Sequence, residues 1–422
     1  MIALKDRFNQ VSMHDPSQDI INIYKDVPEI NETDNRGEPI CRPLFSHSSL
    51  PDRMNMKLIP VQEFDFKSEF SYFVHVHHNQ KLWPRHINKI PNIILENIRK
   101  GNGWLIFDNT LEGDRIDGEY LLVQLYGNIK KLNLPFDKIV FITNDLNAEQ
   151  THKEFGSNER IKVISYMWNV YDIKRLTTHK YLREINVSDE IDYKKTNINK
   201  VKHFLKINRT NRPERDLCML FIEKENLYDK FKISFPQLGE DGFPPHNRFK
   251  KYTTPELIKS LESKLPFDID ETDESNHGPA GIGKGKFDAD LPLQPIHYRD
   301  TLISLVLGAF PFVENCCHLH SSTYNPIYQG HPIIQFGPYK SLERMKEQGF
   351  KTFDKWWDES YDDIEDGWER FEAVLSLVHK VSKLPKHKVL GMLDEMSDTL
   401  QHNIDLINNY TINNLMDRIY EH

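Results

Sequence analysis

A group of cationic and amide side chains follows the apolar segment HFLKI. Asn208, Arg209, Arg212 and Arg215 lie in the next loop and in the first turn of an expected helix, which Pro213 suits as a first residue. Guanidinium groups beside a helix N-terminus attract anions, because backbone N–H groups, the helix dipole and bidentate donors all favour phosphate. The pattern predicts a phosphate-binding loop, although ordinary salt bridges in an acidic protein would use the same residue types.

Two further polar groups follow apolar segments later in the chain. Glu314 to His320 comes after TLISLVLGAF, and Gly337 to Ser341 begins at the end of HPIIQFG. If these apolar segments are parallel strands, both groups lie at the carboxyl edge of one sheet, where such sheets bind ligands. The hydroxyls of Ser321, Ser322 and Thr323 open a short helix there, where they could bind a ribose or a phosphate, or only cap the helix.

The first half of the chain alternates apolar runs with helical patterns. Helices are expected over 87–101, closed by Gly101, and over 117–134, followed by a third, polar helix. Between them lie short apolar runs with the length and composition of strands, at 70–76, 103–109, 138–144 and 160–166. This order predicts a parallel sheet with helices on its faces, because right-handed crossovers require them.

A polar linker at 189–200 separates this half from a second α/β pattern. That pattern has expected strands at 201–207, 301–310 and 331–337. Helices are expected at 212–227, at 254–264 with Thr254 as the N-cap residue, and after Ser341, which is expected to be an N-cap residue as well. A helical tail follows, with a break at 383–385. The sequence therefore predicts an α/β protein with two Rossmann-like domains facing a cleft. The expected segments are an irregular N-terminal arm (1–65), a first Rossmann-like domain (66–195), a second Rossmann-like domain (196–385) and a helical tail (386–422).

Composition narrows the class of protein. Lys and Arg number 54 against 63 Asp and Glu, a formal net charge of −9, which argues against broad nucleic-acid or anionic-membrane binding. The four cysteines show no disulfide framework, so a reducing compartment is expected. Neither a signal peptide nor the ~18 consecutive apolar residues of a membrane span is visible. We therefore expect a cytoplasmic protein without membrane insertion, and the oligomeric state stays open.

Several segments together resemble a known family. Asn208 to Arg215, PIYQGHPIIQFGP, SLERMKEQGFKTF, and WWDESYD followed by a helix with Arg370 resemble a glycosyltransferase group frequent in large viruses and marine phages. That group is distantly similar to the C-terminal half of α1,3-fucosyltransferases, and the resemblance covers residues 100 to 410. It implies a GT-B arrangement, a nucleotide-sugar held by the C-terminal domain, and the host cytoplasm as location if the protein is viral.

The resemblance also implies donor-binding positions, and one segment among them departs from the family pattern at three residues. The segment matching His320 to Ile327 usually reads Thr-Glu-Lys-Thr-x-Lys-Pro-Ile, with the Glu on the ribose and the first Lys on the phosphates. This chain has Ser321 and Ser322 there, and Asn325 replaces the second Lys. The implied donor-binding residues are Asn208, Arg209, Arg212, Glu314, Ser321, Ser322, Thr323, Gly337 and Lys340.

Two functional hypotheses follow from this departure. If Arg209, Arg212 and Lys340 compensate for the missing cation, the chain is a metal-independent glycosyltransferase without a cofactor, hexosyl- or fucosyltransferase-like. It would move a sugar from a nucleoside-diphosphate donor to a hydroxyl of a glycan acceptor. The alternative is a non-catalytic relative that binds glycans or serves as a structural, possibly virion, component.

The acceptor side is expected in FDNTLEGD, which follows a buried strand of the first domain. An inverting transferase needs a carboxylate or a histidine to take the proton of the acceptor hydroxyl. Glu112 is the first candidate, followed by Asp114 and then Asp108. A solvated loop, in which Asp108 and Asn109 only form turns, would show the same residues.

Overall fold

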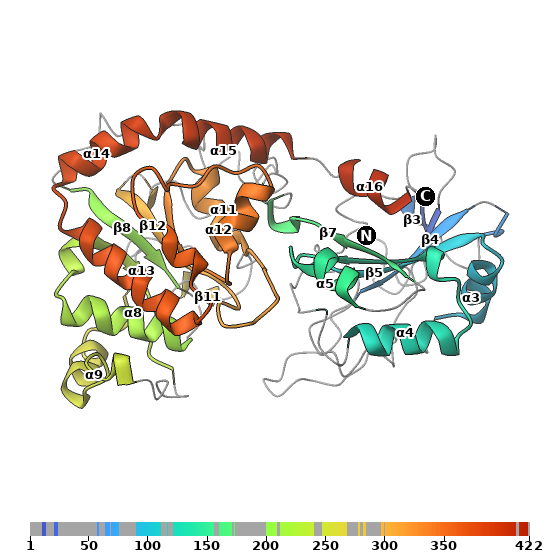
Figure 1. Ribbon diagram of the computed structural model, residues 1–422, viewed down its shortest axis with the longest axis horizontal. Helices are drawn as coiled ribbons and strands as arrows, with labels where there is room; N and C mark the ends of the chain where they lie inside the picture. Colours follow the sequence, from blue (N-terminus) through green and yellow to red (C-terminus); the bar gives the residue numbers. More distant parts are fainter. Residues whose placement is uncertain are drawn as a thin grey trace. The chain divides into compact units, whose positions relative to one another are not determined.

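A computed structural model of the protein describes residues 11–13, 21–23, 57–58, 64–67, 69–75, 90–110, 116, 121–155, 160–170, 173, 200–208, 212–239, 247–267, 277–278, 282–283, 297–298, 300–410 and 413–420. The chain forms two compact units (Figure 1). Unit 1 comprises residues 1–168, 315–318 and 411–422, and unit 2 comprises residues 169–314 and 319–410.

Unit 1 contains a seven-stranded sheet in the order β3-β1-β2-β4-β5-β6-β7. Strands β4 to β7 are parallel and lie side by side in chain order, as the sequence predicted: β4 (Phe70–His75), β5 (Gly103–Asn109), β6 (Ile139–Thr143) and β7 (Lys162–Ser165). Three short strands from the segment expected to be irregular join the β4 edge: β1 (Val11–Met13), β2 (Ile21–Ile23) and β3 (Lys57–Leu58).

Helices cover both faces of the unit 1 sheet. Right-handed crossovers between strands in chain order place α3 (Asn92–Arg99), α4 (Leu121–Lys131) and α5 (Ala148–Glu154) on one face. Their apolar side chains pack on Leu105, Phe107 and Phe141 in a continuous core, and the short η4 (Phe136–Lys138) precedes β6. Gly101 ends α3 with a φ of +84°, a conformation that favours glycine.

The C-terminal helix α16 (Asn413–Tyr420) packs on unit 1 rather than on unit 2. The Tyr420 hydroxyl lies 2.7 Å from Ser71 Oγ, and the Tyr420 ring contacts the Trp104 ring edge-on at 5.9 Å. Arg418 pairs with Glu149 of α5. The last helix of the chain therefore completes the first unit.

Unit 2 contains a four-stranded parallel sheet in the order β13-β12-β8-β9. The chain runs from β8 (Lys202–Ile207) outward to β9 (Phe231–Ser234), and then returns to the other side of β8 for β12 (Thr301–Leu307) and β13 (Ile333–Phe336). This reversal creates a topological switch point between β8 and β12, the position at which open parallel sheets bind ligands.

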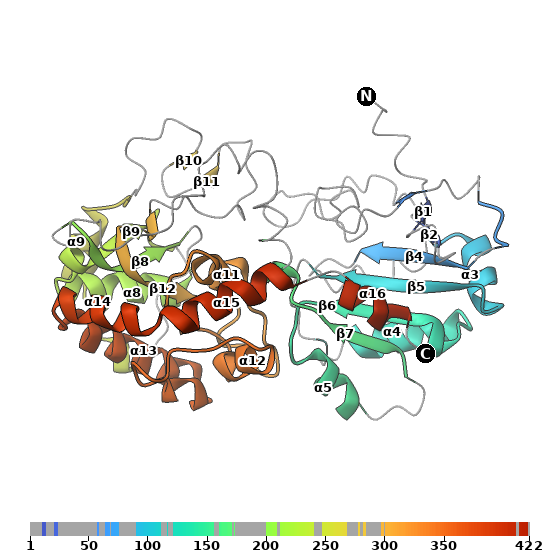
Figure 2. The same cartoon turned by 90° about the horizontal axis from the view of Figure 1, so that it is seen from above.

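Right-handed crossovers leave this switch point in opposite directions, so α8 (Pro213–Lys224) and α11 (Ser321–Tyr328) cover opposite faces of the sheet. Helix α8 contacts α13 (Gly367–Ser382), and α11 contacts α15 (Ser397–Asn409) (Figure 2). The other elements are α9 (Pro255–Glu262), α12 (Ser341–Glu347), α14 (Lys386–Glu395), η6 (Tyr228–Lys230), η7 (Asn247–Phe249), η9 (Ser360–Asp363), and the two-residue strands β10 (His277–Gly278) and β11 (Ile282–Gly283).

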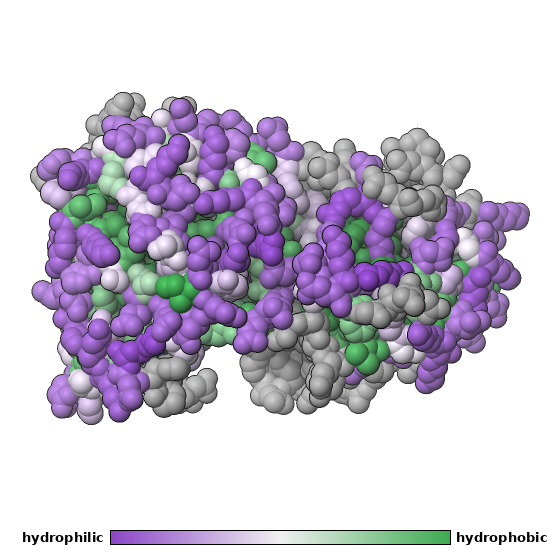
Figure 3. All heavy atoms as spheres, viewed as in Figure 1, coloured by the Kyte–Doolittle hydropathy of each residue, from purple (hydrophilic) through white to green (hydrophobic). Residues whose placement is uncertain are grey.

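The prediction of an α/β chain with two Rossmann-like domains is confirmed by the four parallel strands at the centre of each unit, β4 to β7 in unit 1 and β13, β12, β8 and β9 in unit 2. The face drawn in Figure 3 is mostly hydrophilic, with hydrophobic side chains in small patches. Within the described ranges, none of the helices combines the length and the apolar character that crossing a bilayer requires. Large hydrophobic side chains are exposed there at Ile93, Val123, Phe312 and Tyr339.

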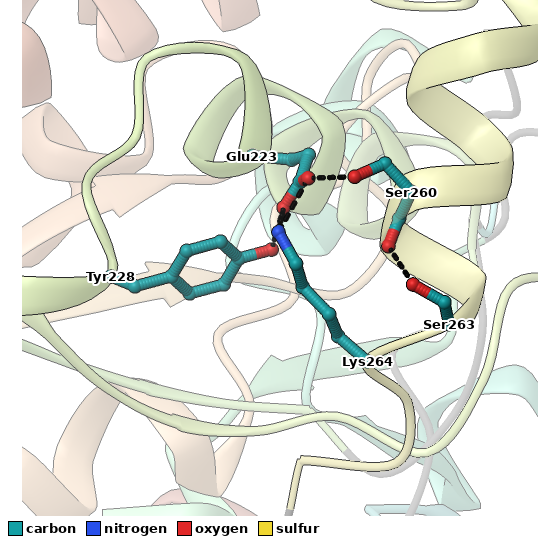
Figure 4. A network of polar contacts seen from close by, with 5 residues as sticks. All are labelled: Glu223, Tyr228, Ser260, Ser263 and Lys264. Atoms are coloured by element: carbon teal, nitrogen blue, oxygen red, sulfur yellow. Dashed lines mark hydrogen bonds and ion pairs between the residues drawn. The ribbon is translucent and has the colours of Figure 1, made fainter.

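A polar network attaches α9 to the C-terminal end of α8 (Figure 4). The largely buried Glu223 carboxylate accepts hydrogen bonds from Tyr228 (2.5 Å), Ser260 (2.5 Å) and Lys264 (2.6 Å). Burial alone would raise the pKa of Glu223, but these three donors outweigh it and lower the pKa below its ordinary value.

Replacing Glu223 by Gln should lower the free energy of unfolding by about 1–2 kcal/mol at neutral pH, because Lys264 is partly exposed and solvent screens its charge. Since the folded-state pKa is depressed, this contribution is full above the unfolded pKa of about 4.3 and is lost as pH falls through the folded pKa. Urea denaturation near neutral pH and in acid measures both effects. Glu262→Gln, on the exposed side of α9, is the control, and an equal loss in the two variants would contradict the assignment.

Candidate functional site

The predicted donor-binding residues follow three strands of the unit 2 sheet. Strand β8 ends before Asn208, β12 ends before the loop that carries Glu314, and β13 ends before Gly337. Because these strands are parallel, their carboxyl ends lie at one edge of the sheet. Arg209 lies outside the described residues.

Two arginines border the switch point between β8 and β12. Arg212, the N-cap residue of α8, makes no side-chain capping bond, and its guanidinium lies 5.8 Å from the centre of the Phe310 ring. Arg215 donates a hydrogen bond from Nη2 to the carbonyl of Leu307 at 3.3 Å. Burial lowers the pKa of Arg215 to about 10, and the neighbouring Arg212 adds to this shift. Cations from the start of α8 thus reach the end of β12 and the loop that follows it.

A buried ionisable cluster lies beneath these arginines. Lys206 donates a hydrogen bond to Asn208 Oδ1, and the Gly239 N–H donates to Asp216 at 2.9 Å. Burial lowers the pKa of Lys206 to about 8, raises the pKa of Asp216 to about 6, and raises the pKa of Glu214. The sequence analysis missed these three residues. The pattern that could have indicated them is a lysine inside an apolar strand, followed by two acidic residues in the first turn of the next helix.

The start of α11 is capped by His320 and not by the serines. His320 Nδ1 accepts from the Ser322 N–H at 3.3 Å and lies 3.0 Å from Ser321 Oγ. Ser322 is exposed, and the buried Thr323 hydroxyl has no hydrogen-bond partner among the residues that the structure describes. The hydroxyls of Ser322 and Thr323 therefore take no part in capping.

The N-terminus of α12, the helix after β13, is capped by the carboxylate of Asp362. Asp362 accepts hydrogen bonds from the N–H groups of Leu342 (2.9 Å) and Glu343 (3.1 Å) and from Ser341 Oγ (3.1 Å). The prediction of Ser341 as the cap is wrong, because Lys340 is the N-cap residue, with a φ of 60°. The amides that a phosphate would use at α12 are thus already bonded to Asp362.

Gly337 and Lys340 are also engaged with neighbouring side chains. A Cβ at Gly337 would come within 2.6 Å of Ser341 Oγ and 2.8 Å of Gln335 Nε2, so a side chain at this position would have to displace those two side chains. Lys340 pairs with Glu343 at 2.7 Å. Glu314 is exposed in the loop after β12. At this edge of the sheet, the loops after β8 and β12 remain the better position for an anion.

Glu112 and Asp114, the first two candidates for the proton acceptor, lie outside the described residues. Asp108, at the end of β5, is buried and accepts from the Thr110 N–H (3.0 Å) and the Thr110 hydroxyl (2.6 Å). Asp108 thus forms a turn, as the alternative interpretation expected, but in a buried position and not in a solvated loop. The neighbouring Asn109 is also buried, and its amide group has no hydrogen-bond partner within the described part of the chain.

Segment 315–318 joins unit 1 at the end of β6. Asp145 accepts from the Cys317 N–H at 2.8 Å, and the Leu146 N–H donates to the Cys317 carbonyl at 2.9 Å. Cys316, Cys317 and His318 are buried there. In the described ranges, no group of three or more His, Cys, Asp or Glu side chains is placed to hold a metal ion.

Comparisons with known proteins found similar solved structures but no matching family model and no matching curated protein. An α,α-trehalose 6-phosphate synthase from Burkholderia multivorans is 10% identical over 83% of this chain and 70% of that one, with a TM-score of 0.40. A UDP-forming α,α-trehalose-phosphate synthase from Burkholderia vietnamiensis is 10% identical over 83% and 72%, with a TM-score of 0.36. A third, from Burkholderia xenovorans, is 8% identical over 85% and 75%, with a TM-score of 0.37. Similarity at this level assigns neither a family nor an activity to this chain.

Proposed function

We propose that this chain is a nucleotide-sugar-dependent glycosyltransferase that moves a hexose or deoxyhexose from a nucleoside diphosphate to a glycan hydroxyl. The observation that carries the proposal is the position of Asn208, Arg212 and Arg215 at the topological switch point of the unit 2 sheet. The resemblance of this loop and of the segments after β12 and β13 to a glycosyltransferase group supports it. That resemblance also implies a viral origin and a cytoplasmic location.

In this proposal, the side chains at the switch point neutralise the negative charge of the diphosphate. Negative charge grows on the diphosphate leaving group as the glycosidic bond breaks, and fixed cations stabilise that charge most where water is excluded. Arg212 suits this role, because no side-chain hydrogen bond within the described part of the chain engages its guanidinium. The exposed Ser322 hydroxyl would bind the ribose, and the exposed rings of Phe312 and Tyr339, in the loops after β12 and β13, would stack on the base or the sugar.

Compensation for the missing family cation would come from the arginines. Ser322 stands where the family has a lysine, and Lys340 is already paired with Glu343. Arg209 and Arg212 would then neutralise the diphosphate, and Asn208 would donate a hydrogen bond to it without adding charge.

The proton acceptor for the glycan hydroxyl is proposed to be Glu112 or Asp114. Both follow β5 in sequence, at the carboxyl edge of the unit 1 sheet. Asp108 is the weaker candidate, because its carboxylate is bonded to Thr110.

A thermal-shift screen against UDP-, GDP- and CMP-sugars, with and without EDTA, tests the proposal. The matching nucleotide-sugar at 100 times its Kd should stabilise the protein by ~2.7 kcal/mol, with or without EDTA, and the parent nucleoside should not. Stabilisation by glycans but by no nucleotide would favour the non-catalytic alternative. Stabilisation that EDTA abolishes and manganese restores would contradict metal independence.

A further inference from the structure

Lys206 is a fully buried lysine at the end of β8. Its side chain is 0% exposed, its ammonium donates to Asn208 Oδ1, and Nζ lies 4.9 Å from the centre of the Phe235 ring. Burying an ammonium carries a large desolvation cost, and an apolar side chain of similar volume often fills such a position with equal or greater stability. Packing alone therefore does not account for a lysine here.

Acidic and cationic groups of α8 face this ammonium. Glu214 and Asp216, in the first turn of α8, are 2% and 3% exposed, and they act on Lys206 together with Arg215 and Cys218. Glu214 Oε1 and Asp216 Oδ1 have no hydrogen-bond partner in the described ranges. These carboxyl groups offset part of the cost of the buried charge, but they do not bond to it directly.

The bond from Lys206 fixes the orientation of the Asn208 side chain. With Oδ1 accepting from the ammonium, Nδ2 must point the other way, and a flipped amide would set two donor groups against each other. None of the described residues accepts a hydrogen bond from Nδ2. Asn208 is 4% exposed and follows β8 directly, so this donor group lies at the switch point that Arg212 and Arg215 border.

We propose that Lys206 is a positioning residue that holds Asn208 with its Nδ2 directed at the oxygens of a diphosphate bound at the switch point. Its positive charge adds to the field of Arg212 at the same oxygens. This inference rests on the proposed function, because it presupposes a nucleoside diphosphate there.

The charge of Lys206 gives the inference a pH signature. Burial lowers the pKa of Lys206 to about 8, so the ammonium is present below that pH and lost above it. Affinity for the diphosphate should therefore fall between about pH 7 and about pH 9. Asp216, with a pKa of about 6, titrates below this range, whereas Arg215 (about 10) and Cys218 (about 11) titrate above it. Any pH dependence of the affinity that comes from Glu214 should persist in Lys206→Met.

Calorimetric titration with UDP and with GDP tests the inference on the full chain. At about pH 7, Lys206→Met and Asn208→Ala should each weaken binding of the preferred nucleotide by ~10-fold. The double variant should lose clearly less affinity than the two single losses combined, because both changes remove the oriented Asn208 donor. The wild type should lose affinity at about pH 9, and Lys206→Met should not. Lys202→Met, on the same strand at its opposite end, is the control and should stay within about two-fold of wild type.

The outcomes separate the two proposals. No binding of either nucleotide by the wild type would overturn both. Wild-type binding that Lys206→Met leaves unchanged, or effects of Lys206→Met and Asn208→Ala that add fully, would overturn only the role of Lys206. If Lys206→Met does not fold, the wild-type titration decides, because an affinity that is flat between about pH 7 and about pH 9 overturns the inference.

Discussion

Replacing Arg370 by methionine should destabilise the protein by about 3–5 kcal/mol, because several buried carbonyls lose their donor at a cost of about 1–3 kcal/mol each and relax only in part. Arg370 is 2% exposed and donates to the carbonyls of Pro311 (2.6 Å), Gly337 (3.2 Å) and Glu365 (3.0 Å), and also to that of Ile364. Pro311 and Gly337 belong to the loops after β12 and β13. One guanidinium therefore joins the two loops, and methionine would leave their carbonyls without a donor.

Urea denaturation of wild type and Arg370→Met measures this effect. Arg248→Met is the matched control, because Arg248 is an arginine of the same unit that pairs with Glu369 at the surface. The control should change stability little, since exposed ion pairs contribute little. Comparable unfolding midpoints for the two variants would show that Arg370 does not hold the loops.

Replacing Arg212 by alanine should lower kcat/KM for the nucleotide-sugar by ~100-fold, on the order of 2.7 kcal/mol of transition-state stabilisation. The variant removes the guanidinium that we propose neutralises the negative charge of the departing diphosphate. Stability should change little, because Arg212 is only half-buried and forms no capping bond.

Steady-state kinetics with the donor that the thermal-shift screen selects provide the measurement, with Arg248→Met again as the control. Arg212→Lys should recover part of the loss, because it restores the charge but not the bidentate geometry. Wild-type kinetics in Arg212→Ala would remove Arg212 from the donor site.

Much of the fold was predictable because its signals are local. The seven strands predicted in the two halves of the chain are present, and Pro213 opens α8 as expected. The Thr254 side chain caps α9 through the Leu257 N–H. Strand β9 was missed, because its four residues become a strand mainly through contact with β8, where the Phe231 and Phe204 rings stack at 4.7 Å.

The candidate site was predictable only in outline. Which loops share an edge followed from the order of strands and helices, but the partners within that edge are distant in sequence. Asp362 caps a helix that begins 21 residues earlier. No local pattern shows that Lys206 stays inside the sheet and bonds to Asn208, since a lysine near a strand end could equally reach solvent.

The most direct test of a nucleotide site at the switch point is a structure of the protein with bound UDP or GDP. We expect diphosphate oxygens at about 2.7–3.2 Å from the guanidinium of Arg212 and from Asn208 Nδ2. A nucleotide bound at the carboxyl edge of the unit 1 sheet, or no bound nucleotide at saturating concentration, would contradict the proposal.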